Sequence, residues 1–131
     1  MSKPFCPLRY AFGVQKEADL LKTIENNLGE EIIREENLVS TKDYQSKNYN
    51  IELKSRRYYD CNKYSNWLVP VSKFRDTSKP IIIYYYWDGD KTLWRYDYKV
   101  EDVPQFIIGP GPISSQIQYD IPKRFFTQIK P

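Results

Sequence analysis

Histidine is absent from this sequence of 131 residues. Without imidazoles the chain cannot form a Ser-His-Asp triad or a histidine zinc site, and histidine general acid–base catalysis is excluded. Any bound metal must therefore be held by oxygen atoms, which favours Mg²⁺ or Mn²⁺ over Zn²⁺. Cysteine is scarce: Cys6 and Cys61 are the only two, and they lie too far apart for a metal-ligand pair. We expect both to be free thiols in a reducing compartment.

Long hydrophobic runs are also missing from the sequence. No stretch approaches the roughly 20 apolar residues that cross a membrane, and the N-terminus lacks the apolar core of a signal peptide. We therefore expect an intracellular, soluble protein without a membrane partner. The length of 131 residues suits one small domain, and the net charge of +3 is compatible with a nucleic-acid partner without requiring one.

Aromatic residues, in contrast, are abundant, with twelve tyrosines and three tryptophans. Such rings either stack on exposed nucleobases or fill a β-rich core and its half-wet edges. For any single tyrosine, the structural role is the default interpretation.

Residues 43–54 are expected to form a β-hairpin around a tight loop at Lys47 and Asn48. In this register the numbers of paired residues sum to ninety-five, which sets Asp43 across from Glu52 with Cβ atoms about 4.5–5.5 Å apart. Side chains alternate along the second strand. One face would carry Tyr49, Ile51 and Leu53, and the other would carry Asn50, Glu52 and Lys54.

Two carboxylates and an ammonium on one face form a minimal set for metal-assisted phosphodiester hydrolysis. Neighbouring carboxylates repel each other unless one is protonated or a divalent cation lies between them. Mg²⁺ prefers one or two carboxylates together with waters and phosphate oxygens. A metal held by Asp43 and Glu52 would acidify a water and shield the phosphate. Lys54 would orient or deprotonate that water, or stabilise the developing charge.

These residues resemble the signature of the PD-(D/E)XK nuclease superfamily, which has the restriction-endonuclease-like fold. The signature is an Asp, a short gap and then Glu/Asp-any-Lys on the next strand, and here it matches Asp43 and Glu52-Leu53-Lys54. Lys42 stands where the family's name has a proline, a position that varies in the family. The resemblance covers residues 13–86. The glycine–glutamate–glycine spacing of the first helix and the run at residues 51–56 are also similar to small nuclease-like proteins of large DNA viruses.

The resemblance implies an α/β fold with a central mixed β-sheet flanked by helices. It also implies an endo- or exonuclease that acts on DNA with Mg²⁺ or Mn²⁺. Asp43 and Glu52 would bind the metal, the backbone carbonyl of Leu53 would be a further ligand, and Lys54 would be catalytic. A homodimer is compatible with cleavage of two strands. A viral source would place the protein in the host cytoplasm, the nucleus or the virion.

Residues 14–28 have the apolar spacing of a helix, and Gly29 is a typical end signal. Glu17 lies at the centre of an apolar face that consists of Leu21, Ile24 and Leu28. A carboxylate there is costly unless it is paired or binds metal. The resemblance implies that a first-helix Glu helps to coordinate metal or water, so Glu17 is our candidate and Glu25 is the alternative. The competing interpretation is that Glu17 only stabilises the first turn of the helix.

Basic and aromatic residues alternate directly after the Glu-X-Lys strand. Cationic side chains contact phosphates, and aromatic rings stack on exposed bases. The expected nucleic-acid-binding residues are Arg56, Arg57, Lys63, Tyr64 and Trp67, and the alternative is a loop of ordinary surface charge. The resemblance adds Lys73, because in many relatives a Lys or Gln on the helix after this strand joins the active site. Ser72 is expected to cap that short helix.

The later part of the chain is predicted to extend the sheet. Residues 81–87 indicate a buried central strand, Asp88-Gly89 indicates a hairpin turn, and residues 92–98 alternate as the next strand. Residues 101–114 indicate an irregular loop, residues 116–121 a last strand, and residues 123–129 a short helix after Pro122. The domain thus divides into an extended arm at residues 1–12, a motif-bearing core at 13–86, and additional strands with a C-terminal short helix at 87–131.

Two other functions stay open beside the nuclease. One is a non-catalytic nucleic-acid-binding module on the same fold, carried by the basic and aromatic stretch. The other is a structural or virion interaction protein whose tyrosines serve an interface. In that case Glu52 and Lys54 would pair on an exposed strand and contribute under about 1 kcal/mol.

Overall fold

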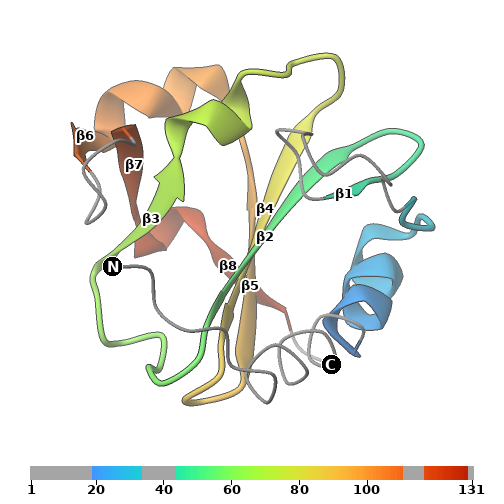
Figure 1. Cartoon of the computed structure of the whole chain (residues 1–131), viewed down its shortest axis with the longest axis horizontal. Helices are drawn as coiled ribbons and strands as arrows, with labels where there is room; N and C mark the ends of the chain where they lie inside the picture. The colour runs from blue at the N-terminus through green and yellow to red at the C-terminus, as the bar shows by residue number, and fades with distance from the viewer. Residues whose placement is uncertain (1–18, 34–43, 111–116, 130–131) are drawn as a thin grey trace, which may run out of the picture.

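The computed structural model describes residues 19–33, 44–110 and 117–129, which form a small, strand-rich α/β domain (Figure 1). Within these residues the strands form a five-stranded sheet in the order β1-β2-β4-β5-β8 and a three-stranded sheet in the order β3-β7-β6. The five-stranded sheet contains β1 (Tyr44–Gln45), β2 (Asn50–Arg56), β4 (Ile81–Trp87), β5 (Thr92–Asp97) and β8 (Thr127–Ile129). The three-stranded sheet contains β3 (Asn66–Pro70), β6 (Ile107–Pro110) and β7 (Ile117–Pro122). The larger sheet is mixed, as predicted, because β2 and β4 run parallel while its other pairs are antiparallel.

One face of the five-stranded sheet is covered by the helix of residues 19–28. Leu20 and Ile24 of this helix pack against Ile51, Leu53 and Tyr84 of the sheet. The helix ends where predicted, since Gly29 has a φ of 76° and its N–H donates to the carbonyl of Glu25 at 2.8 Å. The predicted first turn of the helix lies outside the described residues.

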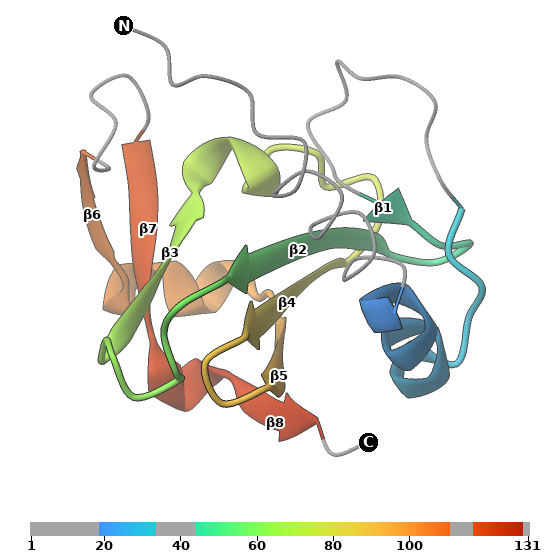
Figure 2. The ribbon, with the colours of Figure 1, turned by 60° about the horizontal axis from the view of Figure 1, so that its bottom comes forward.

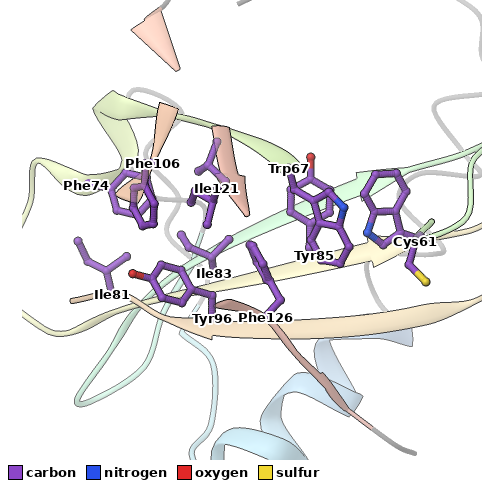
Figure 3. Close-up of a cluster of buried hydrophobic side chains, with 12 residues drawn as sticks. Cys61, Trp67, Phe74, Ile81, Ile83, Tyr85, Tyr96, Phe106, Ile121 and Phe126 are labelled. Carbon is purple, nitrogen blue, oxygen red and sulfur yellow. The ribbon is translucent and has the colours of Figure 1, made fainter. Parts of the chain in front are cut away.

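The opposite face is covered by the three-stranded sheet, so the larger sheet lies between the helix and the smaller sheet (Figure 2). Figure 3 shows Trp67 of β3 and Ile121 of β7 beside Tyr85 and Ile83 of β4. The prediction of flanking helices is therefore confirmed on one face only. On the other face, alternating apolar residues in β3 and β7 provide the cover that we expected from a helix.

The crossover between the parallel strands β2 and β4 contains a loop, β3 and the 3₁₀ turn η1 (Val71–Phe74). Parallel neighbours need such a connection, which must pass over one face of the sheet. This crossover carries Lys73 over the face of the five-stranded sheet that packs against the three-stranded sheet. Ser72 does not cap η1: Pro70 occupies the N-cap position, and no side chain caps the turn.

The predicted strand at residues 81–87 and its hairpin are confirmed. All seven residues of β4 are buried, which explains the continuous apolar run. In β5, Trp94 and Tyr96 face the three-stranded sheet, whereas Leu93 faces the helix.

Two predictions for the last third of the chain are wrong. Residues 123–129 do not form a helix: a 3₁₀ turn, η3 (Lys123–Phe125), precedes strand β8, which pairs with β5. The expected irregular loop contains a 3₁₀ turn, η2 (Val100–Gln105), and strand β6, which pairs with β7. In both cases a β-branched segment forms a strand because an open strand edge lies beside it. No helix in the described part of the chain is long and apolar enough to span a membrane.

Candidate functional site

The hairpin of β1 and β2 has the predicted register. Tyr44 pairs with Ile51 and Gln45 with Asn50. The loop is closed by Ser46, whose N–H donates to the carbonyl of Tyr49 at 2.9 Å. Asp43 directly precedes the first described pair, so its place across from Glu52 stays a prediction. Glu17 also lies outside the described residues.

The predicted division of faces along β2 is confirmed. Ile51 and Leu53 pack in the core beneath the helix. Glu52 and Lys54 pair in register with Ile83 and Tyr85 of β4, which belong to the opposite core. Because paired residues in a sheet share a face, Glu52 and Lys54 point toward the three-stranded sheet.

Glu52 is a buried carboxylate between two ammonium groups. The Nζ of Lys54 lies 3.9 Å from its Oε1, and the Nζ of Lys73 lies 3.3 Å from its Oε2. The Glu52 side chain is only 4% exposed, against 29% for Lys54 and 20% for Lys73. Removing a carboxylate from water is costly unless cations compensate it, and the two lysines do so here. We call Glu52, Lys54 and Lys73 the lysine-flanked carboxylate.

The lysine-flanked carboxylate provides part of the donor set that a hard cation needs. Its carboxylate oxygens suit Mg²⁺ or Mn²⁺. Among the described residues, however, no group of three or more His, Cys, Asp or Glu side chains could hold a metal ion. The fit of a metal therefore depends on Asp43 and on the Leu53 carbonyl, both of which remain predicted ligands.

Glu25, the alternative first-helix ligand, has another role in the structure. Its carboxylate accepts a hydrogen bond from the backbone N–H of Ile32 at 3.3 Å. The helix also covers the face of the sheet opposite to Glu52. We therefore assign Glu25 to the end of the helix, whereas the role of Glu17 stays a prediction.

The basic and aromatic stretch after β2 forms a loop at residues 57–65 that carries exposed rings. Tyr58, Tyr59 and Tyr64 are 69%, 44% and 50% exposed. The Nζ of Lys63 lies 5.3 Å from the ring centre of Tyr59 and 6.0 Å from that of Tyr64. Arg57 lies 5.3 Å above the ring of Tyr58. The predicted interleaving thus produces cation–π contacts on the surface.

The β4–β5 turn holds this loop in place (Figure 1). The N–H of Gly89 donates to the carbonyl of Tyr59 at 3.0 Å, and the N–H of Asp88 donates to the carbonyl of Arg56 at 2.8 Å. A Cβ at position 89 would lie 2.6 Å from the carbonyl carbon of Tyr59. The close approach of the two backbones therefore requires glycine.

Trp67 was expected to contact nucleic acid, and the structure corrects this. Its side chain is only 1% exposed, and its ring packs 5.1 Å from the rings of Tyr85 and Trp87 and 4.7 Å from that of Phe126. An indole in this position cannot serve as an exposed stacking surface. The alternation of Trp67 and Val69 in β3 could have predicted this burial, because both side chains point inward.

Arg56 continues the polar face of β2 beyond Lys54. Its Nε donates to the hydroxyl of Tyr85 at 3.2 Å, and that hydroxyl donates to the carbonyl of Leu68 at 3.2 Å. Burial raises the pKa of Tyr85 above its ordinary value, so this hydroxyl remains a donor at neutral pH.

A pocket of about 340 Å³, which the sequence did not indicate, lies beside Arg56. It is lined by Arg56, Tyr59, Tyr64, Ser65, Asn66, Trp67, Leu68, Tyr85, Trp87 and Asp120. These residues come from β2, β3, β4, β7 and the loop at residues 57–65, so no single stretch of sequence could have revealed it.

No family model matches this chain, and the comparisons with curated proteins and with solved structures found no match either. The resemblance to the PD-(D/E)XK nucleases therefore rests on the motif residues of the sequence.

Proposed function

We propose that this chain is a Mg²⁺-dependent nuclease of the PD-(D/E)XK type, with a restriction-endonuclease-like fold, that hydrolyses phosphodiester bonds in DNA. The observation that carries the proposal is the buried Glu52 carboxylate, which lies between the ammonium groups of Lys54 and Lys73. Buried ionisable groups are costly, and they are concentrated at sites with a chemical role.

The roles follow from charge and position. Glu52 would hold the metal together with Asp43 and the Leu53 carbonyl, which requires the hairpin register to continue by one pair. When bound, the metal would supply Lewis acidity and an acidified water. Lys54 would orient that water, and Lys73 would contact the phosphate. The two ammonium groups would balance the negative charge of the phosphate that the metal binds.

The order of elements supports the same assignment. A helix precedes the hairpin, the Glu-X-Lys strand is its second strand, and the next helical turn carries Lys73. The loop at residues 57–65 continues directly from β2, so DNA bound at Glu52 would extend over its cations and exposed tyrosines.

A non-catalytic nucleic-acid-binding module is the second candidate. The observation that favours it is the exposed group of Tyr58, Tyr59 and Tyr64 with Arg57 and Lys63 beside their rings. This candidate predicts salt-dependent binding without metal that persists after Asp43→Asn. The structural or virion protein is less favoured, because it requires Glu52 and Lys54 to pair on an exposed strand whereas Glu52 is buried.

Cleavage assays with the full chain test the proposal. Single-stranded, double-stranded, nicked and branched DNA would be incubated with Mg²⁺ or Mn²⁺. We expect cleavage that falls by about 10²–10⁴-fold in Lys54→Ala and in Glu52→Gln. Lys22→Ala, which changes an exposed lysine on the helix, is the matched control and should retain full activity. Absence of cleavage on every substrate, or unchanged cleavage in Lys54→Ala and Asp43→Asn, would overturn the nuclease.

A further inference from the structure

The pocket beside Arg56 lies on the face of β2 that carries Glu52. Its volume of about 340 Å³ is within the range of about 300–1,000 Å³ that is typical of small-molecule sites. Arg56 is four residues beyond Glu52, which corresponds to about 13 Å along a strand. An extended nucleic-acid strand would cover this distance in a few nucleotides.

Aromatic rings form one end of the pocket. Tyr59 and Tyr64 stand at its exposed rim with ring centres 6.0 Å apart, and Trp67 and Trp87 form buried walls with ring centres 5.1 Å apart. Tyr64 joins the two groups, because its ring centre is 6.4 Å from that of Trp87. The exposed rings of Tyr59 and Tyr64 suit a flat, polarisable ligand that stacks on them at the rim.

The other end of the pocket is polar and offers both donors and acceptors. Arg56 supplies guanidinium N–H groups, and the carboxylate of Asp120 supplies oxygen acceptors. The Nδ2 of Asn66 lies 3.5 Å from Oδ2 of Asp120, which holds the carboxylate at the pocket wall. A nucleobase matches this end, since its edge displays ring or carbonyl acceptors together with amino donors.

Trp87 adds a separate indication that a polar ligand atom belongs here. Its Nε1–H is buried and has no hydrogen-bond acceptor among the described residues. The other two tryptophans are satisfied, since Trp67 donates to the carbonyl of Tyr64 at 3.2 Å and Trp94 donates to Oγ1 of Thr92 at 3.0 Å. A buried N–H without an acceptor is costly, and Trp87 lines the pocket, so we infer that a bound ligand supplies the missing acceptor after a small shift of the rim.

We propose that this pocket binds one unpaired nucleobase of a nucleic-acid strand. The base would stack against Tyr64, accept a hydrogen bond from Trp87 and meet Arg56 and Asp120 with its polar edge. Lys63 at the rim would neutralise the adjoining phosphate. Taken with the proposed nuclease, on which this further step rests, the pocket selects single-stranded or branched substrates over a fully paired duplex.

The indole N–H resonances of the chain test this site directly. The full chain, labelled with ¹⁵N, would be titrated in EDTA with a six-nucleotide single-stranded DNA and with an abasic strand of the same length. We expect the Trp87 indole resonance to shift with the base-containing strand and to stay in place with the abasic strand. The Trp94 resonance serves as the internal reference, because its indole already has an acceptor. Equal shifts with both strands, or no Trp87 shift at saturation, would overturn the pocket.

The affinity of variants for the single strand is a second measurement, and the substituted side chains lie outside the buried core. Tyr64→Ala and Asp120→Asn should weaken binding of the single strand by about five- to a hundredfold. Val100→Ala is the control, since Val100 is 72% exposed, lies outside the loop at residues 57–65 and does not line the pocket. A mononucleotide should bind more weakly than the hexamer, whereas equal affinity would contradict recognition of a strand.

This design separates the two proposals. Titration in EDTA requires no catalysis, so base-dependent shifts without any cleavage would overturn the nuclease and support the pocket. Conversely, metal-dependent cleavage that is lost in Lys54→Ala but unchanged in Tyr64→Ala and Asp120→Asn would support the nuclease and overturn the pocket.

Discussion

The Nζ of Lys73 lies 3.3 Å from Oε2 of Glu52, although a loop and a strand separate the two residues along the chain. The contact exists because the crossover from β2 to the parallel strand β4 passes over the face to which Glu52 points. The crossover that covers the core between the two sheets therefore also places a second ammonium group, that of Lys73, beside the buried carboxylate of Glu52.

The coupling between Glu52 and Lys73 can be measured with a double-mutant cycle. Glu52→Gln, Lys73→Ala and the double variant would be compared by urea denaturation. We expect an interaction free energy of about 0.5–3 kcal/mol, because each single change leaves a partly buried charge with one partner fewer. Additive effects of the two changes would contradict a direct interaction. Lys22→Ala, paired with Glu52→Gln, is the control cycle and should be additive.

Local signals were enough to predict the elements around Glu52. The short loop after Gln45 fixed the register of the hairpin, the β-prone run at residues 81–87 identified the buried strand, and Gly29 marked the end of the helix. Each of these features depends on neighbours in sequence. The placement of Glu52 and Lys54 on one face follows from alternation alone.

The features that the sequence did not reveal depend on distant partners. Strand β8 forms because β5 offers an open edge, and β6 forms beside β7, so neither could be recognised from its own residues. The pocket requires Arg56, Tyr64 and Asp120 to meet from three separate segments. Lys73 was found through the family resemblance rather than through any spacing rule.

Trp67 should be essential to stability because its ring packs inside the aromatic core. Trp67→Ala removes a ring that is 1% exposed and is expected to cost about 3–5 kcal/mol of unfolding free energy. Tyr58→Ala, at a side chain that is 69% exposed, should change stability by less than about 0.5 kcal/mol. Chemical denaturation of the two variants measures the contrast. Similar stability of Trp67→Ala and the parent chain would show that this ring is not in the core.

Gly89 should tolerate no side chain. A Cβ there would lie 2.6 Å from the carbonyl carbon of Tyr59, and the contact involves backbone that cannot turn aside. We expect Gly89→Ala to destabilise the fold by more than about 1 kcal/mol and to shift the amide resonances of the loop at residues 57–65. Gly109→Ala is the matched control, because a Cβ at that position meets nothing within 4 Å. An unshifted loop in Gly89→Ala would contradict the close approach of the two backbones.

Alkaline pH should destabilise the fold through its buried tyrosines. Burial raises the pKa of Tyr84 from its ordinary value of 10.0 to about 12, and burial also raises the pKa of Tyr85, Tyr96 and Tyr98. Between pH 10 and pH 12 the unfolded chain releases the Tyr84 proton while the folded chain keeps it. The folded state therefore binds more protons, and the free energy of unfolding falls as the pH rises through this window.

Urea denaturation between pH 8 and pH 12 measures this decline. Tyr84→Phe removes one titrating group, so its stability should fall less steeply with pH even though it loses the hydrogen bond from Tyr84 to Asn27 at 2.8 Å. Tyr58→Phe, at an exposed side chain, is the control for the loss of one tyrosine hydroxyl. If the slopes of Tyr84→Phe and the parent chain coincided above pH 10, a buried, protonated Tyr84 would not be the cause of the alkaline loss. A smaller slope would instead tie the loss to the core beneath the helix, where the Tyr84 ring packs with Leu20 and Ile24.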